Sequence, residues 1–229
     1  MDSPTINLHN VDCMEFMRGL PDKAYDLAIV DPPYGIGNTW GKNRNDTFAK
    51  HKHTFNDAAP DAGYYDELRR VSSHQIIWGA QYLFGMLPTP GHMIFWDKGA
   101  DPDLHHMSAG DFAWSSIVDR SRKVYFHWCG AVKCEPGKKI HPHQKPVALY
   151  RWLLQNYAKP GQRILDTHGG SMSIAIACDI EGYDLDLCEM DKDYFDAGKK
   201  RLEQHRAQPR LFDTPKPEKG DQLTIDDAA

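Results

Sequence analysis

Residues 31–34 (DPPY) place a carboxylate, two prolines and an aromatic ring directly after the apolar run 26–30. An exocyclic amine on a base is a poor nucleophile because its lone pair is delocalised into the ring, and acceptors for both of its N–H groups draw it out of conjugation. Asp31 can supply one acceptor, and the carbonyl of Pro32, held by the adjacent proline, can supply the other. The ring of Tyr34 offers a face on which an extruded base can stack. We interpret this segment as a pocket for a planar amine; the alternative is a Pro-Pro turn that ends a strand.

A second group of candidate residues follows the short apolar run 163–166. Asp166 closes this run, and Gly169 and Gly170 let the backbone approach a ligand at the start of a helix. Glu189 lies near the end of the next expected strand, where a carboxylate can accept hydrogen bonds from both hydroxyls of a ribose. The pattern favours a nucleoside cofactor. Alone it also fits an ordinary turn, and the sequence lacks the G-x-G-x-x-G run typical of NAD sites.

Apolar spacing predicts alternating helices and strands around both groups. Runs typical of buried strands and stretches with helical spacing alternate along the chain, the former at 26–30, 74–80, 92–99, 163–166 and 183–191, the latter at 11–22, 62–73, 146–158 and 174–182. Such alternation forms a mixed, mostly parallel sheet flanked by helices, and ligands bind at the carboxyl ends of its strands. We therefore expect an α/β fold with both groups at one edge of the sheet.

Length and composition suit one domain, because 229 residues with 41% hydrophobic content supply one sizeable core. We expect this domain over residues 1–206, with small polar insertions at 35–63 and about 98–140, and a disordered tail at 207–229. Basic side chains in these insertions either contact phosphates or are ordinary solvated charges. They are Lys42, Arg44, Lys50, Lys52, Arg120, Arg122, Lys123, Lys138 and Lys139.

Charge, targeting signals and cysteine pattern argue against several classes of protein, including uniformly basic, membrane-spanning and disulfide-rich proteins. A net charge of −5 argues against a uniformly basic coat, so a polyanion would have to be held by local basic patches. The polar N-terminus and the lack of a long apolar run predict a cytoplasmic protein with no membrane partner. Five cysteines show no disulfide framework. We expect no metal site, because the spacing is loose among the side chains that could hold zinc, namely His127, Cys129, Cys134, His141 and His143.

Three blocks, 11–35, 141–173 and 183–202, together resemble the DNA amino-methyltransferases that use S-adenosylmethionine (AdoMet). The order, with DPPY before the cofactor loop, is that of the circularly permuted, beta-type members, and phage and prophage members are the most similar around LDTHGGS. The resemblance covers roughly residues 6–202 and implies a Rossmann-like AdoMet-dependent methyltransferase fold.

The resemblance also implies roles for individual residues. The catalytic segment would be Asp31, Pro32, Pro33 and Tyr34. The cofactor would be bound by Asp12 and Cys13 at its adenine, Glu189 at its ribose, Asp166 with Gly169, Gly170 and Ser171 at its methionine end, and Asp31, Gln144 and Lys145 beside these. One position departs from the family, since Met172 stands where glycine is usual. Its side chain would either crowd the cofactor or face the core.

The activity implied is transfer of a methyl group from AdoMet to N6 of adenine in DNA by base flipping, because members with aspartate before Pro-Pro-Tyr more often act on adenine. Alternatives are N4-cytosine methylation, RNA methylation, and an AdoMet-binding or DNA-binding protein without activity. DNA is the expected partner, and a homodimer stays open. The tail segment 208–212 resembles peptides that dock on the bacterial sliding clamp, through Gln208, Leu211 and Phe212; alternatively it packs back on the domain.

Overall fold

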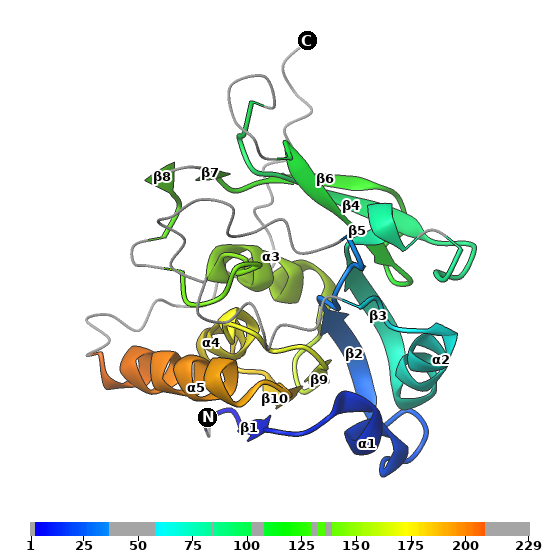
Figure 1. The fold of residues 1–229 in the computed structure, drawn as a ribbon, viewed down its shortest axis with the longest axis horizontal. Helices are drawn as coiled ribbons and strands as arrows, with labels where there is room; N and C mark the ends of the chain where they lie inside the picture. The colour runs from blue at the N-terminus through cyan, green and yellow to red at the C-terminus, as the bar shows by residue number, and fades with distance from the viewer. Residues whose placement is uncertain are drawn as a thin grey trace.

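The computed structural model describes residues 3–36, 58–83, 85–101, 108–129, 132–135 and 139–208. Its main element is an eight-stranded sheet with the strand order β1-β10-β9-β2-β3-β5-β4-β6 (Figure 1). The strands are β1 (Ile6–His9), β2 (Tyr25–Val30), β3 (Ser72–Trp78), β4 (His92–Asp97), β5 (Gly110–Ser115), β6 (Arg122–Tyr125), β9 (Arg163–Asp166) and β10 (Asp184–Cys188). A separate short pair consists of β7 (Trp128–Cys129) and β8 (Val132–Lys133).

The sheet is mixed and mostly parallel, as the sequence predicted. Strands β1, β10, β9, β2 and β3 run parallel to one another. Strand β5 is antiparallel to β3 and to β4, and β6 is parallel to β4. From β9 the chain proceeds to β10 on one side, whereas β2 is followed by β3 on the other. The boundary between β9 and β2 is therefore a topological switch point, where open α/β sheets bind their ligands.

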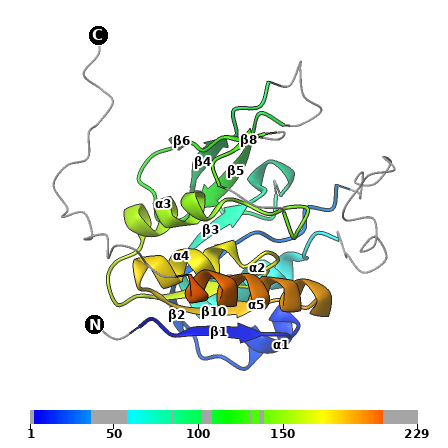
Figure 2. The ribbon, with the colours of Figure 1, turned by 90° about the vertical axis from the view of Figure 1, so that its left-hand side faces the viewer.

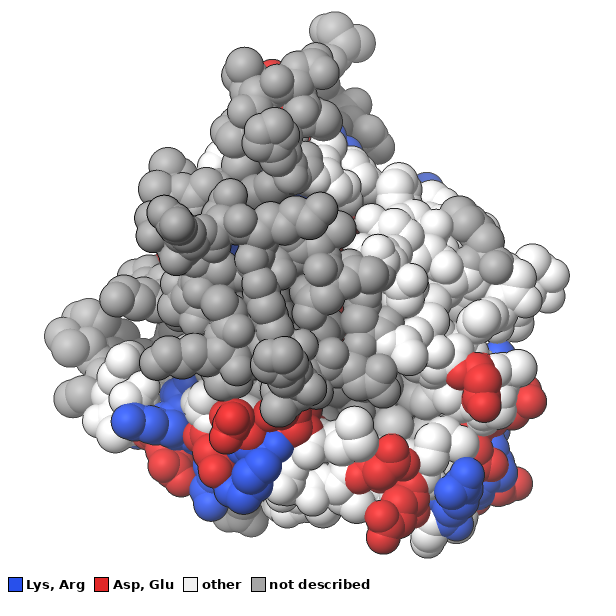
Figure 3. Space-filling view, in the orientation of Figure 1, with Lys and Arg blue, Asp and Glu red and all other residues white. Residues whose placement is uncertain are grey.

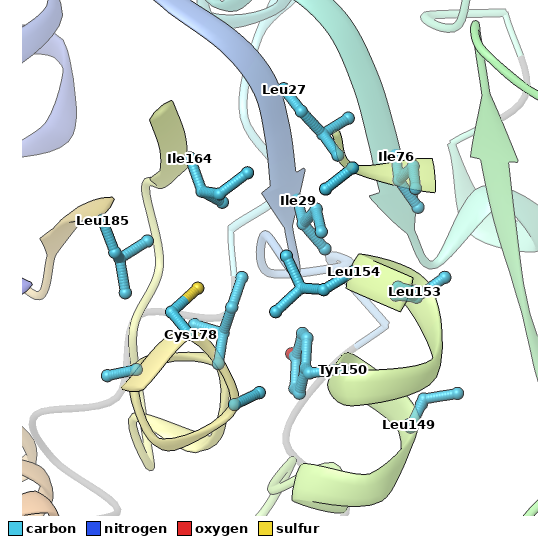
Figure 4. Packing of buried hydrophobic residues seen from close by; sticks show 14 of the residues in the cluster. Leu27, Ile29, Ile76, Leu149, Tyr150, Leu153, Leu154, Ile164, Cys178 and Leu185 are labelled. Atoms are coloured by element: carbon cyan, nitrogen blue, oxygen red, sulfur yellow. The ribbon is translucent and has the colours of Figure 1, made fainter. Parts of the chain in front are cut away.

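Helices cover both faces of the sheet. On one face lie α3 (Val147–Tyr157), α4 (Ser173–Glu181) and α5 (Lys192–Ala207), and on the other α1 (Cys13–Arg18) and α2 (Ala62–Val71) (Figures 1 and 2). Figure 4 shows Ile29 of β2 and Ile164 of β9 on the side of the sheet where Leu154 of α3 and Cys178 of α4 pack. These four residues are fully buried. Burial of each aliphatic side chain of this size contributes about 1.5–3 kcal/mol to folding.

Local signals account for the helix ends. Asp12, Asp61 and Asp191 each accept backbone N–H bonds at the first turn of α1, α2 and α5, as N-cap residues do. Gly182 ends α4 in the left-handed conformation, with φ of 78°. These caps explain why the predicted helices begin and end close to the observed limits.

Strand β5 is one element that the sequence pattern did not predict. Its sequence GDFAWS lacks a continuous apolar run, yet it lies between β3 and β4 in the sheet. Trp114 of β5 stands opposite Ile77 and is buried in the core. Strands β5 and β6 of the main sheet and the pair β7 and β8 all lie within residues 98–140, the range in which the sequence predicts a small polar insertion.

Several predicted residues lie outside the described part of the chain. They are Lys42, Arg44, Lys50, Lys52, Lys138, Leu211 and Phe212. Helix α5 extends to Ala207, one residue into the predicted tail, and Gln208 is its C-cap. None of the helices in the described segments is long and apolar enough to cross a membrane.

Candidate active site

The carboxyl ends of β1, β10, β9 and β2 meet around a cavity of about 340 Å³, a volume typical of small-molecule sites. Nearly all of the catalytic and cofactor residues predicted from the sequence line it: Asp12, Cys13, Asp31, Pro32, Pro33, Tyr34, Gln144, Lys145, Gly169, Gly170, Ser171 and Glu189. Asp166 is the exception. Its side chain accepts the backbone N–H of His168 at 2.9 Å, and the residue is 2% exposed. Asp166 therefore anchors the loop after β9 from a buried position outside the cavity lining.

The predicted catalytic corner consists of Asp31, Tyr34 and Lys145. The hydroxyl of Tyr34 donates to Oδ1 of Asp31, and the ammonium of Lys145 forms an ion pair with Oδ2. Nζ of Lys145 also donates to Oη of Tyr34 at 3.1 Å. Burial, followed by the charge of Asp31, raises the pKa of Tyr34 well above its ordinary value. The phenol therefore stays protonated and acts as a donor to the carboxylate.

The wall behind Tyr34 comes from the turn after β3, which the sequence reasoning missed. Gly79 has a φ of 79° and lies against the tyrosine ring, and Tyr82 of the 3-10 turn η2 (Ala80–Tyr82) stacks on that ring with centroids 5.3 Å apart. The backbone N–H of Tyr82 donates to the carbonyl of Gly79 at 2.8 Å. The available signal was a glycine at the carboxyl end of a buried strand.

The loop between β9 and α4 is fastened to β10. Glu189 accepts the N–H of Gly170 at 2.7 Å and the N–H of Asp191 at 2.8 Å. The N–H of Gly169 donates to the carbonyl of Cys188 at 2.8 Å, and a Cβ atom on this glycine would lie 2.2 Å from Leu187. Only glycine lets the loop pack this closely on the strand.

Met172 faces the core. Its side chain is fully buried and does not line the cavity, and it lies against Gly198 of α5, where an added Cβ would be 2.7 Å from Cγ of Met172. The residue adopts a φ of 56° directly before α4. Since the side chain points away from the cavity, the departure from the family at this position does not crowd the site.

An aromatic and histidine-rich wall completes the cavity, and sequence reasoning did not identify it. The hydroxyls of Tyr64 and Thr167 are 2.7 Å apart, and Thr167 is 2.9 Å from Nδ1 of His168. The rings of His141 and Tyr194 meet edge to face at 4.4 Å. Burial lowers the pKa of His168 to about 4, so its ring is neutral near pH 7. The sequence signal for these residues was weak, because tyrosines on an amphipathic helix usually belong to the core.

Burial raises the pKa of other titratable groups at the site. Desolvation raises the pKa of Asp166 to about 8 and that of the Cys13 thiol to about 12, the latter with help from Asp12. Burial also raises the pKa of Glu189, against the two backbone N–H groups that stabilise its charge. Among the residues that the structure describes, no cluster of three or more His, Cys, Asp or Glu side chains is arranged to hold a metal ion.

A comparison with known families decides the class of protein. The family N6_N4_Mtase, described as DNA methylase, matches residues 48–200, about two thirds of the chain. This chain belongs to that family of DNA methylases. Members use AdoMet, the cofactor that the sequence predicted. In this methylase the DPPY segment after β2 precedes the predicted cofactor loop after β9, as in the permuted, beta-type class.

Individual relatives agree with this assignment. The methylase is 22% identical to the type II methyltransferase M.HpaI of Haemophilus parainfluenzae, over 84% of this chain and 72% of that protein. It is 23% identical to the putative methylase YubD of Escherichia coli (strain K12), over 83% and 87%.

Solved structures confirm the Rossmann-like methyltransferase fold. The M1.HpyAVI–SAM complex superposes with a TM-score of 0.56 at 19% identity, covering 86% of this chain and all of the other. The cytosine-N4-specific PvuII DNA methyltransferase superposes with a TM-score of 0.59 at 12% identity, covering 90% and 93%.

Proposed function

We propose that this DNA methylase transfers a methyl group from AdoMet to N6 of adenine in DNA, with the base flipped into the cavity. The observation that carries the proposal is the position of Asp31 and Pro32, which line the same cavity as the glycine loop Gly169–Ser171. AdoMet supplies an electrophilic methyl group on a sulfonium. The enzyme contributes chiefly by holding the amine in line with that group.

The cofactor half of the cavity suits a nucleoside joined to an amino acid. Asp12 and Cys13 from the start of α1 line one end, and Glu189 lies at the end of the adjacent strand β10. We assign the adenine and ribose of AdoMet to this end and the methionine to the loop around Gly170. Leu187 of β10 fills the space where a side chain at Gly169 would stand, and the backbone of this loop lines the cavity at Gly169 and Gly170.

The base half is the corner of Asp31, Pro32 and Tyr34. The two acceptors would take the N–H groups of the target amine and localise its lone pair, and the ring of Tyr34, which lines the cavity, would stack on the base. Because these hydrogen bonds strengthen as positive charge develops on the nitrogen, they stabilise the transition state more than the bound substrate.

We favour adenine over cytosine as the target base because aspartate precedes Pro-Pro-Tyr, as it more often does in family members that act on adenine. Cytosine N4 is the second candidate, favoured by the likeness to the cytosine-N4-specific enzyme, although 12% identity relates the two proteins by fold alone. Both bases present an exocyclic amine to the same acceptors, so the corner chemistry is shared. The choice between them depends on the shape of the base pocket.

DNA contact in an acidic protein would depend on a few basic residues. In Figure 3 the charged side chains of the described residues gather along the lower edge, over α5 and over α1 and α2. The basic residues Arg120 and Lys123 are 71% and 65% exposed and pair with Asp119 and Asp97. DNA phosphates would compete with Asp119 and Asp97 for these two side chains. Because added salt screens such phosphate contacts, DNA affinity should fall steeply as the salt concentration rises.

The test is methyl transfer from tritiated AdoMet to unmethylated DNA, followed by digestion to nucleosides and mass spectrometry. We expect N6-methyladenine, and N4-methylcytosine would establish the second candidate. Label on RNA but not on DNA would contradict both. AdoMet binding in a calorimeter without transfer to either nucleic acid would identify a binding protein instead.

A further inference from the structure

Lys145 lies at the catalytic corner, although the sequence predicted it as a cofactor residue. It directly precedes Pro146, the N-cap of α3, and its side chain is 3% exposed. Its ammonium pairs with Oδ2 of Asp31 and donates to Oη of Tyr34. The lysine thus bridges the two side chains that the proposed reaction places on the base.

We propose that Lys145 is a positioning residue that holds the Asp31 carboxylate for the target amine; this deepens the proposed function and rests on it. The ion pair occupies Oδ2 of Asp31 and Tyr34 occupies one lone pair of Oδ1. A carboxylate oxygen has two lone pairs, so Oδ1 keeps one for an N–H of the base. Held from both sides, the carboxylate loses the freedom to rotate away.

The backbone of Lys145 is fixed from three elements. Its carbonyl accepts the hydroxyl of Ser173 at 2.8 Å, and that hydroxyl accepts from Arg201 of α5, also at 2.8 Å. Next to it, the indole N–H of Trp128 donates to the carbonyl of Gln144 at 2.9 Å. With its backbone anchored to α4, α5 and β7, the lysine can place its ammonium at one point of the corner.

The groups around the Lys145 ammonium stabilise a positive charge at a fixed position. Nζ lies 5.4 Å from the ring centre of Trp78, within the range of cation–π attraction. Asp31 is 12% exposed, so the pair is largely shielded from water. Because removal of one partner leaves the other charge buried, the pair constrains the corner more strongly than a surface salt bridge would.

This arrangement predicts separate effects on binding and on chemistry. Lys145→Met removes the ammonium and keeps the apolar stem. We expect the single-turnover rate at saturating AdoMet to fall by about 100-fold, because the acceptor is misplaced, with the AdoMet dissociation constant unchanged. The matched control is Lys23→Met, since the ammonium of Lys23 is also held by hydrogen bonds, to the carbonyls of Arg69 and Ser72 at 2.7 and 3.0 Å, but lies away from the cavity. It should transfer methyl at the wild-type rate.

Chemical rescue separates positioning from packing. In Lys145→Ala, added ethylammonium should restore about a tenth of the lost rate or more by re-forming the N–H donors, whereas tetramethylammonium, which has the same charge and no N–H group, should not. If Lys145→Ala does not fold, Asp31→Asn/Lys145→Met should regain thermal stability relative to Lys145→Met without regaining activity.

Four outcomes would overturn the proposal. They are wild-type turnover in Lys145→Met, a rate loss that saturating AdoMet abolishes, equal effects of the two ammonium ions, and no gain in stability when both charges are removed. A wild-type protein that binds AdoMet but methylates no nucleic acid would instead mean that the proposed function itself fails, and the positioning role with it.

Discussion

Gly79 leaves the space that the ring of Tyr34 occupies: a Cβ atom on this glycine would stand 2.1 Å from Cε1 of the tyrosine. The two residues come from the ends of neighbouring parallel strands, β2 and β3. Two features require glycine here. A Cβ atom would clash with Tyr34, and the φ of 79° is unfavourable for residues other than glycine. The orientation of Tyr34, and through its hydroxyl that of Asp31, therefore depends on a residue outside the DPPY segment.

Gly79→Ala should displace Tyr34 and lower methyl transfer by at least about 10-fold, with little change in AdoMet affinity, because a shift of the order of 1 Å in a catalytic group costs up to about 100-fold. The control is Gly85→Ala. Gly85 also has a positive φ, of 92°, but nothing lies within 4 Å of its added Cβ. Equal losses in the two variants would attribute the effect to backbone strain and contradict the contact with Tyr34.

Asp31→Asn should reduce transfer by about 100-fold or more, since it removes the charged acceptor that acts in the transition state. It also leaves the ammonium of Lys145 beside a neutral amide, so the melting temperature should fall. Asp26→Asn is the matched control, because Asp26 lies on the same strand, where it accepts the N–H of Arg163 at 2.9 Å. Transfer at the wild-type rate in the Asp31 variant would refute its catalytic assignment.

Glu189→Gln should weaken AdoMet binding by about 1–3 kcal/mol, because the amide can accept only one of the two backbone N–H groups, of Gly170 and Asp191, that the carboxylate now accepts. The loop keeps the hydrogen bond from Gly169 to Cys188 of β10, but the site loses the charge of its carboxylate. Glu203→Gln, on the exposed side of α5, is the control. Calorimetric titration with AdoMet measures both, and equal dissociation constants would place the ribose elsewhere.

Titration of Asp166 should make the free energy of unfolding depend on pH between about 6.5 and 8. Its pKa is about 8 in the fold against an ordinary 3.8, so in this window the folded state holds a proton that the unfolded chain has lost, and stability falls as pH rises. His168, with a pKa of about 4 against 6.5, acts in the opposite direction but only below 6.5. The loss attributable to Asp166 is at most about 2 kcal/mol.

Urea unfolding at pH 6.5 and 8 tests this dependence without ligand. Asp166→Asn keeps an oxygen acceptor for the N–H of His168 and cannot titrate, so its stability should lack the decline. The carboxylates of Asp31 and Glu189 raise the pKa of Asp166, after burial, and Lys145 lowers it. The same slope in both proteins would show that another group is responsible.

The sequence by itself determined β2, β3, β9 and β10 in the parallel part of the sheet, but not β1, and it gathered most of the predicted site residues at one edge. The apolar run before Asp31 and the run that ends at Asp166 each predict a buried strand, and parallel strands bring their carboxyl ends to one edge. That rule was enough to gather the DPPY segment, the glycine loop and Glu189 around one cavity, because each position follows from local periodicity.

Tertiary structure alone decided what these residues touch. The hydrogen bond from Lys145 to Tyr34 spans 111 positions of sequence, and the contact of Tyr64 with Thr167 spans 103. The direction of Met172 depends on Gly198 of another helix, and β5 joins the sheet without an apolar run of its own. Periodicity reports which face of an element is buried, but the partner on that face is set by how distant elements pack, so the lysine's role at the catalytic corner became visible only in the fold.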